Sequence, residues 1–177
     1  MHTDTFEIEG AASTGLEAQL KVVIAYADLS AASIAKRILH DSLAVLSSRF
    51  TVETNFWKFE LLSSPVLQEM AMQDATAAHI IIISTEKEYG LPEGARNWIE
   101  TCLTKPHVKD VAFVALVRDN HDADDGSTAA LEHFSAPQKT DFFWFIANDH
   151  AGQRLAAEKI IQLACQSSMA ERLHCVG

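Results

Sequence analysis

The chain has 177 residues, which is enough for about one compact domain with a sizeable core. Its 24 acidic and 14 basic side chains leave a net charge of −10, which disfavours binding to nucleic acid or to an anionic membrane. No apolar run is long enough to span a bilayer, and residues 1–5 lack the features of a secretion signal, so we expect a cytoplasmic protein. The three cysteines are odd in number and widely spaced, which argues against a disulfide framework and against a zinc site.

Residues 1–20 mix small and polar side chains without a sustained period. We expect them to form a flexible lead-in to a single domain over residues 21–177.

Four compact hydrophobic blocks predict strands that are buried on both faces, as in a parallel sheet covered by helices. The blocks are residues 22–26, 80–83, 111–117 and 142–146. Residues 50–57 alternate partly between polar and apolar side chains, which is typical of an edge strand.

Between these blocks the apolar residues recur at helical spacing. Helices are predicted from about residue 30 to 46, 65 to 78, 92 to 105, 127 to 134 and 150 to 173. Asp28 or Ser30 caps the first helix, and Pro65 and Pro92 suit the first turns of the next two. The alternation predicts a three-layer α/β sandwich with a five-stranded parallel sheet. The alternating second strand favours the order 2-1-3-4-5, with a Rossmann order that lacks its sixth strand as the alternative.

A ligand of such a sheet binds beyond the carboxyl ends of the strands, at the switch point between the first and third strands. The loops that meet there are residues 27–33, 84–91 and 118–126.

The first of these loops resembles a degenerate flavodoxin phosphate loop. Residues 24–33 read Ile-Ala-Tyr-Ala-Asp-Leu-Ser-Ala-Ala-Ser, and the hydroxyls of Ser30 and Ser33 are what remains of the flavodoxin pattern. A phosphate cradle usually needs glycine, and no glycine lies between Gly15 and Gly90. At the level of the fold, the resemblance to flavodoxin-like proteins covers most of residues 21–168. At the level of motifs, it rests on very few residues.

The second loop resembles the segment after the third strand in NADPH-dependent flavin reductases of the flavodoxin-like group. Residues 88–98 read Glu-Tyr-Gly-Leu-Pro-Glu-Gly-Ala-Arg-Asn-Trp, with a shorter spacing from Tyr89 to Pro92 than in that family. The resemblance implies that Tyr89 presents its ring to an isoalloxazine, while Pro92, Asn97 and Trp98 fix the helix start. Packing alone also explains a proline and a tryptophan at these positions.

The third loop is dense in carboxylates, and we interpret it as a solvated loop rather than a cation site, because its spacing does not fit an EF-hand. No metal is expected. The rim of the crevice is predicted to be net negative, which opposes a phosphate-bearing ligand.

A response-regulator receiver has the same fold and an acidic crevice. Here Asp28 alone follows the first strand, Ser84 and Thr85 end the third, and Ala147 and Asn148 stand where a receiver has a lysine. Phosphoryl-aspartate chemistry is therefore not expected, although the shape is receiver-like.

Other catalytic patterns are absent from the sequence, including Gly-x-Ser-x-Gly, Walker A, Gly-x-Gly-x-x-Gly and paired metal-binding histidines. Cys102 lies on an apolar stripe, which predicts a buried, inert thiol.

Residues 55–62 are unusually aromatic and either cap the core or form a sticky patch, with capping favoured. The pattern of Trp-x-Phe, Leu, Pro and an Ala-rich helix resembles an uncharacterised bacterial protein group without an assigned activity.

Three functional hypotheses follow. The leading one is a non-catalytic signalling or protein-interaction module without a cofactor, whose protein partner is unknown. The alternative is an FMN-binding oxidoreductase or electron carrier, and a third is a hydrolase or transferase with Asp28 as general base. Residues 169–174 extend the last helix beyond the sheet, which suits a homodimer or a frayed end. The candidate cofactor contacts are Asp28, Ser30, Ser33, Thr85, Tyr89 and Asp119.

Overall fold

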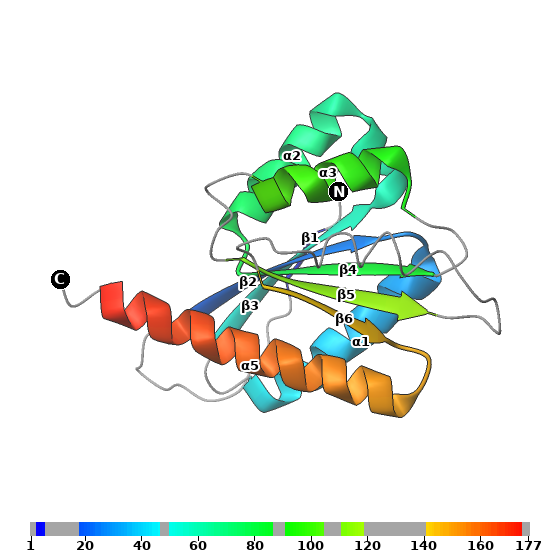
Figure 1. The fold of residues 1–177 in the computed structure, drawn as a ribbon. Coiled ribbons are helices and arrows are strands. Elements are labelled where there is room, and N and C mark those ends of the chain that lie inside the picture. Colours follow the sequence, from blue (N-terminus) through cyan, green and yellow to red (C-terminus); the bar gives the residue numbers. More distant parts are fainter. Residues whose placement is uncertain are drawn as a thin grey trace.

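The computed structural model describes residues 3–5, 18–46, 50–86, 91–104, 111–118 and 141–174. A twisted sheet lies between two layers of helices (Figure 1). Five of its strands run parallel in the order β3-β2-β4-β5-β6, which is the predicted order 2-1-3-4-5 and confirms the predicted fold class. These strands are β2 (Ala18–Tyr26), β3 (Phe50–Lys58), β4 (Ile80–Glu86), β5 (Ala112–Arg118) and β6 (Phe142–Ile146).

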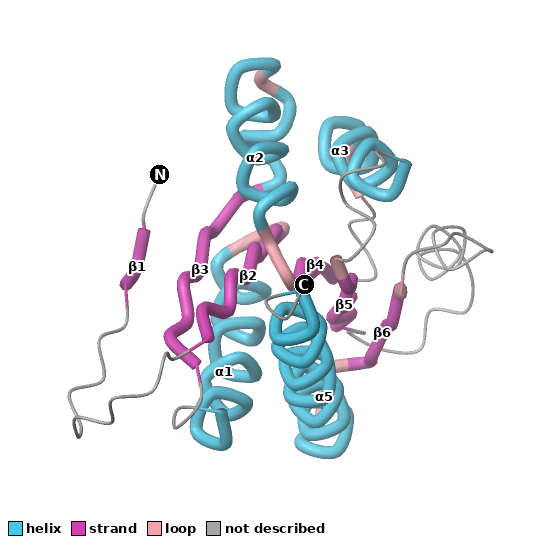
Figure 2. The backbone as a smooth tube through the Cα atoms, turned by 90° about the vertical axis from the view of Figure 1, so that its left-hand side faces the viewer, coloured by secondary structure: helices cyan, strands magenta, loops and turns pink. Residues whose placement is uncertain are grey.

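The helices cover both faces of the sheet, as the periodicity predicts. Helices α2 (Pro65–Ala77) and α3 (Glu93–Thr104) lie on one face, and α1 (Leu29–Leu46) and α5 (His150–His174) lie side by side on the other (Figures 1 and 2). A short 3-10 helix, η1 (Phe59–Ser63), joins β3 to α2. The helix predicted over 127–134 falls outside the described residues. Within the described chain, the helices lack the length or the apolar character needed to cross a membrane.

Strand β4 is the centre of the core because all seven of its residues are buried. Ile80 and Ile82 pack toward α1 and α5, whereas Ile81 and Ile83 pack toward α2 and α3. Burial of such a side chain stabilises the fold by about 1.5–3 kcal/mol. The uninterrupted run of isoleucines therefore serves two cores at once, one on each face.

The edge beyond β3 differs from the prediction. Strand β1 (Thr3–Thr5) pairs antiparallel with β3, so β3 is the second strand from this edge rather than the edge itself. Its alternating pattern therefore does not mark an open edge. Residues 3–5 and 18–20, which we expected in the lead-in, thus belong to the sheet.

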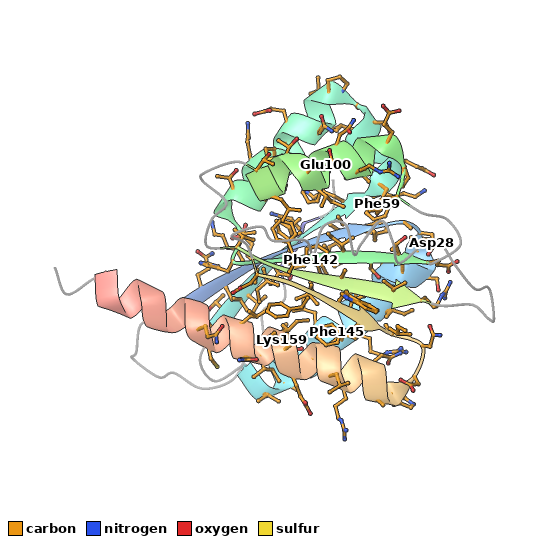
Figure 3. All side chains as sticks on the ribbon, in the orientation of Figure 1. Asp28, Phe59, Glu100, Phe142, Phe145 and Lys159 are labelled. Atoms are coloured by element: carbon orange, nitrogen blue, oxygen red, sulfur yellow. The ribbon has the colours of Figure 1, made fainter. Side chains whose placement is uncertain are left out.

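Strand β6 is not buried on both faces, contrary to the prediction for residues 142–146. It is the last strand of the described sheet, and Trp144 and Ile146 are 40% and 44% exposed. Its other face packs on α5, where the Lys159 ammonium lies 3.7 Å from the centroid of the Phe143 ring. Figure 3 shows Lys159 and Phe145 in this layer. An apolar run in the sequence therefore cannot distinguish a central strand from an edge strand that is rich in aromatic residues.

The aromatic segment of residues 55–62, at the end of β3 and in η1, caps the core, as predicted. Trp57, Phe59 and Leu62 are each at most 3% exposed and pack in the core under α2 and α3. The indole N–H of Trp57 donates a hydrogen bond to Asp74 of α2 at 2.9 Å. The segment thus fixes α2 against the sheet.

Candidate functional site at the carboxyl edge of the sheet

The carboxyl ends of β2, β4 and β5 meet at one edge of the sheet, next to the start of α1. Figure 3 shows Asp28 there, beyond the ends of the strands. This is the switch point of the sheet, where ligands bind in open α/β folds.

The turn between β2 and α1 consists of Ala27 and Asp28 alone. The N–H of Ala27 donates to the Ser84 carbonyl at 3.0 Å, which ties the turn to β4. The Asp28 carboxylate accepts a hydrogen bond from the N–H of Ala31 at 2.8 Å, so Asp28 is the predicted N-cap of α1. The carboxylate that was a candidate general base thus occupies part of the helix N-terminus.

Arg118 connects the end of β5 to the start of α1. Its guanidinium donates a hydrogen bond to the Ser30 hydroxyl and forms an ion pair with Glu86 at the end of β4. Glu86 is buried, and the Arg118 side chain is partly exposed. Among the described residues, the buried Nε of Arg118 has no hydrogen-bond partner. A buried, unsatisfied donor costs free energy.

The other predicted hydroxyls of this edge bond to the backbone. Ser33 donates to the Leu29 carbonyl at 2.8 Å, one turn earlier in α1, and the Thr85 hydroxyl donates to the Glu86 carbonyl at 3.3 Å. Ser84, which was not a candidate contact, donates to the Ala31 carbonyl at 2.8 Å and holds α1 on β4. Tyr89 and Asp119 lie outside the described residues, so their cofactor contacts stay predictions.

Lys58, the last residue of β3, is a further cation among the described residues of this edge, and sequence reasoning missed it. Its ammonium donates a hydrogen bond to Glu60 at 2.8 Å, and this bond is the main reason that its pKa is raised above the ordinary value. The charges of Glu60, Tyr26 and Asp28 raise the pKa further. The signal that could have found Lys58 is positional, because it is the last residue of a parallel strand, as are Glu86 and Arg118, which the sequence already placed on the rim of the crevice.

The described part of the chain contains no group of three His, Cys, Asp or Glu side chains that could hold a metal ion. Cys102 is buried, with its Sγ 3.9 Å from the Met72 Sδ, as expected of an inert core thiol.

The sequence matches no protein-family model and no curated protein. Solved structures match over most of the chain. An NADH:FMN oxidoreductase in its apo form superposes with a TM-score of 0.58 at 13% identity, covering 83% of this chain and 89% of its own. A flavodoxin-like domain from Synechococcus sp. gives 0.51 at 11% identity, covering 84% and 99%. A flavodiiron protein from Giardia intestinalis gives 0.50 at 10% identity, covering 82% of this chain and 35% of its own.

The chain has a flavodoxin-like fold. The flavodoxin-like neighbours also correct the leading functional hypothesis. Two of them are named as an NADH:FMN oxidoreductase and a flavodiiron protein, and neither name describes a receiver or a signalling domain. The interpretation as a non-catalytic interaction module is therefore wrong, and so is the expectation that the chain has no cofactor. These neighbours favour the alternative, an FMN-binding oxidoreductase or electron carrier.

Proposed function

We propose that this flavodoxin-like chain binds FMN at the carboxyl edge of its sheet and acts as a flavin-dependent oxidoreductase or electron carrier. The observation that carries the proposal is the buried, unpartnered Nε of Arg118 beside Ser30 at the N-terminus of α1. A phosphate monoester is a natural partner for such a donor.

Three kinds of phosphate-binding group come together there. A guanidinium binds phosphate through charge-assisted hydrogen bonds, and the Ser30 hydroxyl can donate once it turns from Arg118. The first N–H groups of a helix lack partners within the helix and carry partial positive charge. Arg118 and Ser30 are thus the residues that would hold the phosphate of FMN.

Two features of the same edge disfavour the binding of an anion. Asp28 places a carboxylate on the N–H of Ala31, and the two-residue turn has no glycine with which to wrap a phosphate. We therefore place the phosphate beside the turn, on the Arg118 side, rather than inside a loop. A bound flavin would supply the redox-active ring, and the contact expected at Tyr89 is the predicted support for that ring.

The test is a titration of flavin-depleted, full-length protein with FMN and, separately, with riboflavin, which lacks the phosphate. We expect saturable FMN binding at least tenfold tighter than riboflavin binding. Ser30→Ala and Arg118→Gln should remove most of this difference, while Arg154→Gln, at an exposed arginine of α5, should leave it intact. Equal affinities for the two flavins, or no saturable binding of FMN, would overturn the proposal.

A further inference from the structure

A concave surface lies between α1 and β3 and runs along α1 from Ser33, near the carboxyl edge, to Ala44. It is a groove of about 460 Å³, within the size range of small-molecule sites. Figure 2 shows α1 beneath this part of the sheet. The described residues that line the groove are Ser33, Lys36, Arg37, Leu39, His40, Leu43, Ala44, Thr54 and Phe56.

The groove is long and mostly apolar. Its α1 wall runs from Ser33 to Ala44, which corresponds to roughly 16 Å along the helix axis at 1.5 Å per residue. Leu39 and Phe56 belong to the core cluster on this face, Leu39 as a buried side chain and Phe56 as a half-buried one. A linear apolar chain would cover the exposed parts of these side chains along the whole wall.

Thr54 introduces a polar group into this apolar surface. The residue is only 2% exposed and lines the groove. A threonine hydroxyl can both donate and accept a hydrogen bond. A ligand oxygen in the groove could therefore accept a hydrogen bond from it.

The charge of the groove is opposite to that of the whole chain. Lys36 and Arg37 are cationic residues of its lining, beside His40, and none of the described lining residues is acidic, although the chain carries a net charge of −10. Arg37 also donates a hydrogen bond to Gln153 of α5 at 2.9 Å, which fixes its side chain. A local cationic rim on an acidic protein selects an anion.

We propose that this groove binds a medium-chain carboxylic acid. The carboxylate accepts a hydrogen bond from the Thr54 hydroxyl and faces Lys36 and His40, and the acyl chain lies along Leu39, Leu43 and Phe56. This assignment is independent of FMN binding, so the two can fail separately.

Calorimetric titration of the full-length protein with sodium decanoate, below its micellar concentration, tests the proposal. We expect one saturable site that binds decanoate at least tenfold more tightly than decanol or decylammonium. Octanoate should bind several-fold more weakly than decanoate, because it buries fewer methylene groups. Comparable affinities for decanoate and decylammonium, or no saturable binding of decanoate, would overturn the charge argument and the site with it.

Variants locate the binding. Ala44→Phe fills the groove and should abolish binding, whereas Val45→Phe, at the next and exposed position of α1, should bind decanoate as the wild type does. Thr54→Val should weaken binding several-fold while leaving the free energy of unfolding unchanged or raised. Arg118→Gln should not affect it. Unchanged binding by Ala44→Phe would refute the location, and a concentration-dependent dimer lost in Ala44→Phe would assign the groove to a second copy instead.

Discussion

Arg118, the last residue of β5, donates a hydrogen bond to Ser30 in the first turn of α1, 88 residues earlier in the chain. The same guanidinium is paired with the buried Glu86, so it holds the ends of β4, β5 and α1 together. The group proposed to bind phosphate is therefore also part of the fold's own hydrogen-bond network.

Arg118→Gln is expected to destabilise the protein by about 2 kcal/mol, because Glu86 would keep its buried charge without its cation. The double variant Glu86→Gln/Arg118→Gln should lose less than the sum of the two single variants, since it removes both charges. Urea denaturation of the four proteins measures this coupling. Additive losses would show that the two side chains do not interact in solution.

Asp28 stabilises α1 but opposes an anion at the same helix end. Asp28→Ala is expected to cost about 1 kcal/mol of stability, and Asp28→Asn much less, since asparagine also accepts the hydrogen bond from Ala31. Removal of the charge in Asp28→Asn should raise FMN affinity several-fold. Urea denaturation and FMN titration of the two variants test this pair of effects. Weaker FMN binding by Asp28→Asn would contradict a phosphate next to this turn.

The fold could be predicted because it depends on patterns that are local in sequence. The isoleucine run of β4 and the helical stripes of α1 and α3 each identify an element without any knowledge of its neighbours. The position of β3 could not be predicted, because β1 is only three residues long and carries no apolar period. The exposure of β6 depends on what packs against it, which its aromatic run does not reveal.

The strand ends that meet at the candidate site could be predicted, but the contacts between its side chains could not. The switch-point rule places Asp28 and Ser30 at one edge of the sheet because it follows from topology. That a ligand binds there stays a prediction. The contacts of these side chains could not be found in the same way, because strand register pairs Glu86 with Arg118, and Arg118 contacts Ser30 of α1 only in the folded chain. Ser33 shows the same limit for a single residue. Its hydroxyl donates to a carbonyl of its own helix, and no sequence motif distinguishes such a serine from one that contacts a ligand.

Lys58 provides a test of the electrostatics at this edge. Its folded-state pKa is raised above 10.5, so the stabilisation from its charge is fully present at neutral pH and is lost as the pH rises through the folded pKa. Glu60→Gln should lower the pKa of Lys58, because the hydrogen bond to the Glu60 carboxylate is the main cause of the raised pKa. Heteronuclear NMR titration of the Lys58 ammonium from pH 9 to 12 follows both values. Identical titration curves in the two proteins would mean that the bond does not persist in solution.

Gly152, in the first turn of α5, allows the helix to approach the end of β6 closely. A Cβ at this position would lie 1.8 Å from the carbonyl oxygen of Ile146, a clash with backbone that rotation of a side chain cannot relieve. The N–H of Gly152 also donates to the Asp149 carboxylate at 2.8 Å, which fixes the helix start. Gly152→Ala should therefore destabilise the protein by about 1–3 kcal/mol, despite the better helix propensity of alanine.

Thermal unfolding of Gly152→Ala and of Ala151→Ser measures this effect with a control at the neighbouring exposed position. Ala151→Ser is expected to stay within about 0.5 kcal/mol of the wild type, as surface substitutions usually do. Gly94→Ala, whose Cβ would lie 2.9 Å from the Leu62 carbonyl oxygen, should fall between the two because its clash is milder. A Gly152→Ala protein as stable as the wild type would require α5 to start farther from β6, which would also break the hydrogen bond from Gln153 to the Ala147 carbonyl.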